Sequence, residues 1–228
     1  RIEVCGPDAA IFLHSQTTND VQALDSGQGH ASASLVPKAH LVATYSLHRL
    51  EDRYVLLGDS CRRQALGEHL EKYHVSEDLQ IADHTEESAF LLVQGPRSGS
   101  LLQRLWPEEE LPSQEHAIRP FGPGGEDALI VRRSETGESG FLLVGTPEGI
   151  QEIQGRIREA GPDFDHVEIS AEVFEILRLE AGVPRWGEDM DETQILPETG
   201  LEQQAVSYQK GCYLGQEVVA RVKTYGAV

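Results

Sequence analysis

The sequence predicts an α+β protein made of two similar subdomains. Two observations support this fold class. Short strand-like and helix-like segments alternate, and the order strand, helix, strands, helix occurs twice within the 228 residues. Neighbouring strands are joined by hairpin-length links, which favours antiparallel pairing over a doubly wound parallel sheet. Each subdomain is therefore expected to be a split strand-helix-strand unit.

The first series begins with a short apolar strand, and the turn Gly6-Pro7-Asp8 then opens a helix. Apolar alternation predicts the strands that follow, and Leu66 and Leu70, four residues apart, indicate a second helix. In order, the predicted elements are a strand at residues 2–5, a helix with apolar residues at 11–13, strands at 30–36, 41–47 and 54–57, and a helix at 60–72.

The second series repeats this order after residue 85. Gly95-Pro96 separates a buried strand from a helix, and Thr146-Pro147 opens another helix whose isoleucines recur at helical spacing. The predicted elements are a strand at 90–93, a helix with Leu101, Leu102 and Leu105, strands at 129–131 and 141–144, and a helix with Ile150, Ile153 and Ile157.

The clearest helix runs from the N-cap Ser170 to the stop signal at Gly182. Its inner face is predicted to carry Val173, Ile176 and Leu177, and the same spacing places Glu180 on that face. A buried, unpaired carboxylate costs several kcal/mol, so an inward Glu180 would need fixed donors or a polar ligand. The alternative is that Glu180 reaches solvent or pairs with a nearby arginine, and the pattern leaves both open.

A second informative stretch surrounds Cys212. Two glycines four apart bracket this cysteine, Lys210 lies two residues before it, and a short helix is predicted to follow. A thiol ahead of a helix N-terminus and near a cation would have its thiolate favoured. The alternative is that Cys212 is a small buried side chain that only fills space in a turn. The stretch also contains Gly211, Gly215, Gln216, Glu217 and Arg221, with Glu217 and Arg221 at helical i, i+4 spacing.

Composition excludes several classes of function. The chain has 38 acidic and 19 basic residues and a net charge of −19, so it lacks the basic patches that nucleic-acid backbones require. This acidity also suits a cytosol with high salt. Three separated cysteines offer neither a disulfide framework nor a metal-binding cysteine pair, which predicts a reducing, cytoplasmic setting. No apolar run is long enough for a membrane helix, and no leader opens the chain.

Several motifs together resemble a known family. Lys210-Gly211-Cys212-Tyr213-Leu214-Gly215-Gln216-Glu217, followed by Arg221, is similar to the Lys-Gly-Cys-aromatic-x-Gly-Gln-Glu signature of the YgfZ-type folate-binding proteins. These proteins are relatives of the glycine-cleavage T protein, an aminomethyltransferase. Three further segments agree with that superfamily in order: Gln16 to Val21, Thr136 to Phe141, and Arg178 to Pro184.

The resemblance implies a fold of two interlocked ferredoxin-like subdomains, the first from residues 1–85 with 165–228 and the second from 86–164. It implies tetrahydrofolate, or a one-carbon derivative, as the cofactor, with Glu180 gripping the pterin and Cys212 as the functional thiol. The other residues it implies at the folate site are Thr18, Asn19, Asp20 and Tyr45. Lys210, Gly211, Gly215, Gln216, Glu217 and Arg221 are expected to shape the cysteine loop.

Two departures from the T protein bear on activity. Where that protein has an aspartate on a strand, this chain has Ala43 and Thr44, neither of which can act as an acid or base. Such proteins also usually continue into a small C-terminal β-barrel, which is absent from this chain. The expected function is folate binding that supports iron-sulfur cluster assembly or repair in client enzymes, without direct contact with nucleic acid or membrane. The alternatives are a folate-dependent one-carbon transferase and a ligand-free interaction module.

Overall fold

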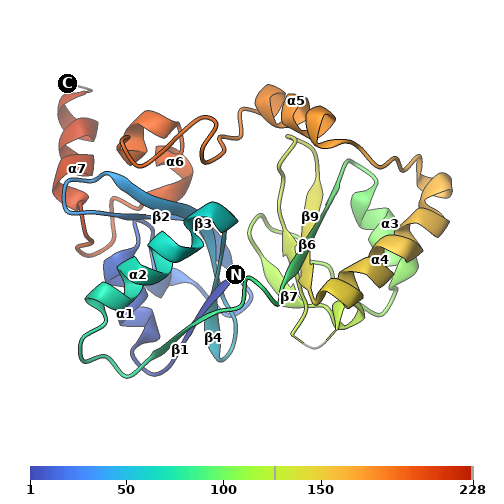
Figure 1. Ribbon diagram of the computed structural model, residues 1–228, viewed down its shortest axis with the longest axis horizontal. Coiled ribbons are helices and arrows are strands. Elements are labelled where there is room, and N and C mark those ends of the chain that lie inside the picture. The colour runs from blue at the N-terminus through green and yellow to red at the C-terminus, as the bar shows by residue number, and fades with distance from the viewer. Residues whose placement is uncertain (126, 227–228) are drawn as a thin grey trace. The chain divides into compact units, whose positions relative to one another are not determined.

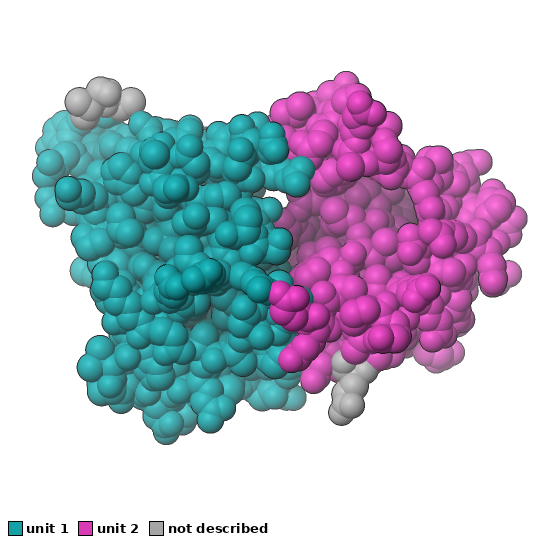
Figure 2. Space-filling model, in the orientation of Figure 1, with its two compact units in different colours: residues 1–85, 184–228 teal, residues 86–183 magenta. Residues whose placement is uncertain are grey.

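The computed structural model describes residues 1–125 and 127–226. It divides into two compact units, Arg1–Thr85 with Pro184–Val228, and Glu86–Val183 (Figure 2). The segment 165–183 lies in the second unit, whereas the resemblance implied that it joins the first. Its contacts give the reason, because Glu168 forms an ion pair with Arg158 and the backbone N–H of His166 donates to Gly161 in the same unit.

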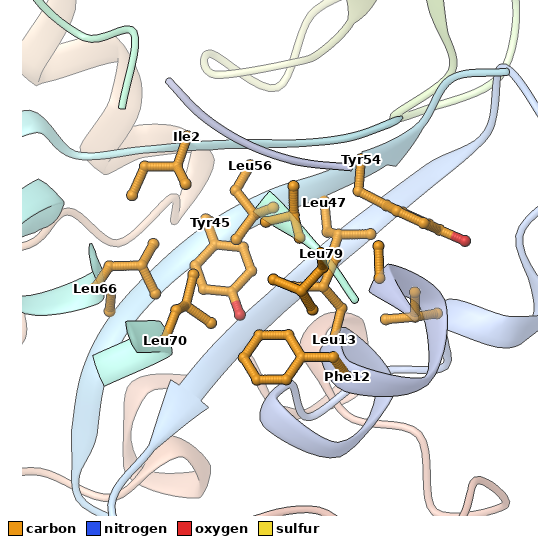
Figure 3. Close-up of a cluster of buried hydrophobic side chains, with 14 of the residues drawn as sticks. Ile2, Phe12, Leu13, Tyr45, Leu47, Tyr54, Leu56, Leu66, Leu70 and Leu79 are labelled. Carbon is orange, nitrogen blue, oxygen red and sulfur yellow. The ribbon is translucent and has the colours of Figure 1, made fainter. Parts of the chain in front are cut away.

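Unit 1 is built on a five-stranded antiparallel sheet with the order β2-β3-β4-β1-β5 (Figure 1). Its strands are β1 (Ile2–Cys5), β2 (Gly29–Leu35), β3 (Leu41–Arg49), β4 (Arg53–Gly58) and β5 (Gln80–Asp83). Helices α1 (Ala9–Gln16) and α2 (Arg63–Tyr73) contribute apolar side chains to a shared core with these strands. Figure 3 shows this core, in which Phe12 of α1 and Leu66 and Leu70 of α2 surround the Tyr45 ring.

A second core of unit 1 forms where the chain returns after residue 184. Leu35, Leu41 and Trp186 are among its buried members. The backbone N–H of Leu41 donates to the carbonyl of Gln194 at 3.0 Å, which attaches the returning chain to the start of β3. The returning elements are the 3₁₀ turn Leu196–Thr199 and the helices α6 (Glu202–Ala205) and α7 (Gln216–Tyr225). The C-terminal segment is therefore part of the first fold unit rather than an appendage.

Unit 2 has a four-stranded antiparallel sheet with the order β6-β9-β8-β7. Its strands are β6 (Ala89–Gln94), β7 (Ile118–Pro120), β8 (Leu129–Arg132) and β9 (Gly140–Gly145). The helices are α3 (Ser98–Leu105), α4 (Pro147–Ala160) and α5 (Ala171–Ala181). Apolar residues of α3 and α4 form one core with β6, β8 and β9, and the Thr146 side chain caps α4 by accepting from the N–H of Gly149.

The predicted α+β class is confirmed, and every predicted strand and helix is present with antiparallel pairing. The sequence did not predict β5 or β7. Both are short edge strands, β5 is only partly buried and β7 ends on Pro120, so neither shows apolar alternation. Among the described residues, no helix is long and apolar enough to cross a membrane.

Unit 1 contains a buried histidine that predicts how stability depends on pH. His69 of α2 is 7% exposed and its ring centroid lies 5.1 Å from that of Tyr73. Burial, reinforced by the Lys72 charge, lowers the pKa of His69 from 6.5 to about 4. The unfolded chain therefore takes up a proton between about pH 6.5 and 4 that the folded chain resists, so stability falls as pH falls through that window.

We expect His69→Phe, which keeps an aromatic ring at this position, to reduce the loss of stability between pH 6.5 and 4. Urea unfolding of both proteins at half-unit pH steps measures this. The informative quantity is the difference in slope between the two proteins, because other acidic and basic groups contribute equally to both. Identical slopes would show that the buried imidazole does not resist protonation.

Candidate functional site

The Cys212 loop exposes its thiol between two buried neighbours. Lys210 and Tyr213 are 8% and 7% exposed, whereas Gly211 and Cys212 between them are exposed. Cys212 is a free thiol, as are Cys5 and Cys61. The alternative of a buried filler is therefore wrong for Cys212, and the chain around it is anchored on both sides.

Lys210 anchors the loop to the C-terminal end of α1. Its Nζ donates to the carbonyl oxygen of His14 and to that of Thr17, the latter at 2.7 Å. The ammonium also lies 5.1 Å from the centre of the Tyr213 ring. Burial lowers the pKa of Lys210 from 10.5 to about 8, and the charge of Asp20 opposes that shift. The predicted role in shaping the loop thus has a structural basis, since this lysine caps a helix.

His14 extends from the same helix end toward the loop. A Cβ built on Gly211 would lie 3.5 Å from His14 Nε2, so the imidazole edge faces the residue that precedes Cys212. On its other side, His14 Nδ1 is 3.4 Å from Asp20 Oδ1. Burial and the Lys210 charge lower the pKa of His14, while Asp20 raises it. No local spacing links His14 to a cysteine 198 positions later, so the sequence alone does not single out this histidine.

The Thr18-Asn19 segment fixes the turn after α1. The fully buried Thr18 hydroxyl donates to the carbonyl of Ala205 at 2.6 Å and accepts from the Ala33 N–H at 2.9 Å. The Asn19 amide donates to the carbonyls of Ala31 and Gln204 at 2.9 and 3.0 Å. These side chains bond to backbone groups of β2 and α6. Asp20 caps the following 3₁₀ turn by accepting from the Ala23 N–H at 3.2 Å.

Tyr45 lies in the core of unit 1 (Figure 3), where it is 5% exposed. Its hydroxyl forms a hydrogen bond with Ser34 Oγ at 2.8 Å. Burial raises the pKa of Tyr45, so its hydroxyl is neutral at physiological pH.

Gly215 is the N-cap of α7 with φ +83°, and a Cβ there would lie 2.9 Å from the Val36 carbonyl oxygen. Gln216 accepts from the Tyr213 N–H at 3.3 Å.

Glu217 and Arg221 form the predicted i, i+4 pair at 2.8 Å on the surface of α7. Their side chains are 83% and 65% exposed, so solvent screens the interaction and it contributes little to stability. These two residues are therefore placed at the helix surface, whereas the anchoring of the Cys212 loop comes from Lys210 and Gly215.

The predicted inner face of α5 is wrong. Val173 and Ile176 are 42% and 55% exposed, and Glu180 is also exposed. The less exposed residues of the helix are 174, 175, 177, 178 and 181, so only Leu177 of the predicted face is partly buried. Arg178 is 3% exposed because its guanidinium donates to the Val183 carbonyl at 2.6 Å and to Glu175 at 2.8 Å. A paired arginine thus occupies the buried stripe, and Glu180, being exposed, does not need a ligand to offset burial.

Glu180 nevertheless lies next to Ala181, which is close to the glycine turn of the Thr136 to Phe141 segment. A Cβ built on Gly137, which has φ +77°, would be 3.4 Å from the Ala181 side chain. The turn 136–140 and the end of α5 are therefore neighbours. Gln94 braces this turn from β6: its amide donates to the Arg133 carbonyl at 3.0 Å and accepts from the Glu135 N–H at 2.8 Å.

The Glu180 carboxylate offers two hydrogen-bond acceptors at the end of α5. No described residue forms a hydrogen bond or ion pair with the Glu180 carboxylate, so both oxygens can accept from a ring amino and N–H pair. Within the described ranges, no group of three or more histidine, cysteine, aspartate or glutamate side chains could hold a metal ion. Asp20, Lys210 and Cys212 all belong to unit 1, where the Asp20 charge acts on Lys210, while Glu180 belongs to unit 2.

Comparison with known proteins identifies the family. A family model described as the GCVT N-terminal domain matches residues 1–210. The chain belongs to this family. It is 30% identical to the aminomethyltransferase of Lysinibacillus sphaericus over 99% of the chain and 62% of that protein, and 27% identical to that of Bacillus subtilis over 100% and 63%. This GCVT-family chain therefore spans about three-fifths of the length of these relatives.

Structural comparison agrees on the fold. The crystal structure of the glycine cleavage system aminomethyltransferase T from Bartonella henselae matches with a TM-score of 0.86 and 24% identity. The match covers 99% of the GCVT-family chain and 61% of the Bartonella chain. A putative chloroplastic transferase of Arabidopsis thaliana is 25% identical over 100% of the chain. The expected T-protein fold is confirmed.

The helix-capping role of Lys210 leads to a stability prediction. We expect Lys210→Met, which keeps the length of the side chain, to destabilise the protein by about 1–3 kcal/mol because two carbonyls lose their donor. Lys223→Met is the matched control, since Lys223 is 53% exposed and its pairing with Glu202 is worth less than about 1 kcal/mol. Urea unfolding measures both, and equal effects would contradict the capping role.

Proposed function

We propose that this chain is the tetrahydrofolate-binding part of a YgfZ-type member of the T-protein family. It supports the assembly or repair of iron-sulfur clusters in client enzymes of the cytoplasm. Family membership and the Lys-Gly-Cys motif support the proposal. Its partners are folate and either client enzymes or assembly proteins, and it contacts neither nucleic acid nor membrane.

The observation that carries folate binding is the free, accessible carboxylate of Glu180 beside the glycine turn. No described residue competes for its oxygens, and the turn 136–140 reaches Ala181 next to it. A reduced pterin presents an amino group and a ring N–H side by side, which matches the two oxygens of one carboxylate. Glu180 would orient the bound ring, and the folate would supply the one-carbon chemistry.

The observation that favours the YgfZ branch over aminomethyl transfer is the absence of an acid on β3. The sequence of this strand contains no aspartate or glutamate, and Ala43 is buried in the apolar core of unit 1. Thr44 is a neutral hydroxyl and cannot hold a negative charge opposite a reacting amine. The exposed Cys212 supplies the chemistry that remains, a nucleophilic sulfur.

The second candidate is a folate-dependent aminomethyltransferase, and the names of the bacterial relatives favour it. Turnover of an aminomethyl donor would support this candidate and contradict the branch we propose. A chain that neither binds folate nor transfers a one-carbon unit would instead be an interaction module.

We expect the full chain to bind tetrahydrofolate and Glu180→Gln to bind it at least about tenfold more weakly, because a charge-assisted bidentate contact is worth roughly 1.5–3 kcal/mol. Glu172→Gln is the matched control, since Glu172 is exposed in the first turn of the same helix. Titration calorimetry under reducing conditions measures all three. Equal affinity of the wild type and Glu180→Gln, or no binding by the wild type, would refute the folate role.

We expect Cys212→Ser to keep folate affinity and to fail in restoring iron-sulfur enzyme activity to a deletion strain, because the hydroxyl is a much weaker nucleophile than a thiol. Cys61→Ser is the matched control, since Cys61 is also free and exposed. The control should restore activity to the wild-type level. Full restoration by Cys212→Ser would exclude a role for the thiol.

A further inference from the structure

Strand β6 is an open edge of the unit 2 sheet. It stands first in the order β6-β9-β8-β7, and among the described strands it pairs with β9 alone. Its residues, Ala89 to Gln94, include no charged residue and no proline, and its register with β9 has no bulge. Edge strands commonly carry such features, which block pairing with another chain. β6 is therefore available to a further strand.

The backbone hydrogen bonds show which residues of β6 face the open edge. The N–H of Gly95, just after the strand, donates at 2.7 Å to the carbonyl opposite it in the β6–β9 register. Bonded and non-bonded pairs alternate along an antiparallel ladder, so Leu91 and Val93 bond to β9. The N–H and C=O groups of Phe90 and Leu92 thus point away from β9. No described residue forms a hydrogen bond with these outward groups.

The side chains of β6 lie alternately on the two faces of the sheet. Ala89, Leu91 and Val93 pack on the core of unit 2. Phe90 and Leu92 lie on the opposite face, because successive side chains of a strand alternate. Phe90 is 42% exposed, and Leu92 is partly exposed. An added strand would therefore cover apolar surface as well as bond to the backbone.

The other sheet edges are less open than β6. The β2 edge is occupied, because the Thr18 hydroxyl and the Asn19 amide bond to its backbone. β5 ends with the charged Asp83, and β7 is a three-residue strand that includes Arg119 and Pro120. Charges and prolines at an edge disfavour the addition of a strand. These differences single out β6.

Acidic residues lie at both ends of β6. Glu86 and Glu87 are exposed shortly before the strand, and Glu138 is exposed on the turn at its other end. The cation near that end, Arg97, is already paired with Asp165 at 2.6 Å. The chain as a whole has a net charge of −19. A basic segment would therefore be attracted to this edge.

We propose that β6 binds an extended, basic segment of a partner protein, which adds a fifth strand to the unit 2 sheet. The backbone of the segment bonds to Phe90 and Leu92, apolar side chains at alternate positions cover the Phe90 ring, and lysines or arginines at its ends meet the acidic residues. Strand addition is a recurrent way of recognising extended peptides. A second copy of this chain fits less well, because it would bring two charges of −19 together. The inference goes beyond the proposed function and depends on neither folate nor Cys212.

The probe is a short peptide that alternates valine and threonine between two pairs of lysines, and its matched control carries glutamates in place of the lysines. Nuclear magnetic resonance of the isotope-labelled full chain follows the amide signals during titration at low salt. We expect the lysine peptide to shift the signals of Phe90 and Leu92 and to slow their hydrogen exchange at least about tenfold. The glutamate peptide should bind at least about tenfold more weakly.

Two variants test the geometry of the edge. Leu92→Pro removes an N–H that points away from β9 and keeps the bonds between the two strands, so it should fold and bind the lysine peptide at least about fivefold more weakly. Phe90→Lys sets a cation against the lysine peptide and should weaken it about tenfold. Val75→Lys is the matched control, at an 85% exposed position of unit 1, and should bind like the wild type.

Equal affinity for the two peptides, or wild-type affinity of Phe90→Lys, would overturn the inference. So would a titration that leaves the signals of Phe90 and Leu92 in place. If circular dichroism shows that Leu92→Pro does not fold, Phe90→Lys decides. Signals of Phe90 and Leu92 that shift with protein concentration alone would show that a second copy takes the edge, which also overturns the partner segment. A failure of folate binding would leave all these outcomes unchanged.

Discussion

The organisation of unit 1 depends on how the C-terminal end of α1 is closed. A helix leaves its last four carbonyls without partners inside the helix, and burying them without donors costs about 1–3 kcal/mol each. Here Lys210 donates to the carbonyls of residues 14 and 17, the Leu214 N–H donates to residue 15, and the Ser34 hydroxyl donates to residue 16. Residues nearly 200 positions apart thus complete one helix end.

This closure explains why the Cys212 loop is both exposed and fixed. The ammonium of Lys210 is buried, which is costly unless donors are matched by acceptors, and two carbonyls and an aromatic face provide that match. Gly211 lies against His14 and Gly215 lies against the Val36 carbonyl, so the loop follows the helix end closely. The thiol is therefore displayed by the packing of its neighbours, and its own side chain contributes nothing to the anchoring.

The sequence predicts the elements better than their orientation. Strands and helices with strong apolar periodicity, such as β3 and α4, are found where expected. The rotation of α5 was wrong because the helix has two apolar stripes one residue apart, and a local pattern cannot show that the buried one contains Arg178 paired with Glu175. The proximity of His14 to Gly211 could likewise not be predicted, since contacts between residues so far apart in the sequence depend on the whole topology.

Hydrogen bonds and solvent exposure divide the motif side chains into two groups. Thr18 and Asn19 have their polar atoms bonded to the backbone of β2 and α6, and Lys210 has its donors on α1, so these side chains hold the fold together. Glu138, Glu180 and Cys212 are exposed members that form no hydrogen bond or ion pair with a described residue. A polar group that the fold does not use stabilises nothing in the native state. The proposed folate role rests on Glu180 of unit 2 and the proposed thiol role on Cys212 of unit 1, because both side chains are left accessible to a molecule outside the chain.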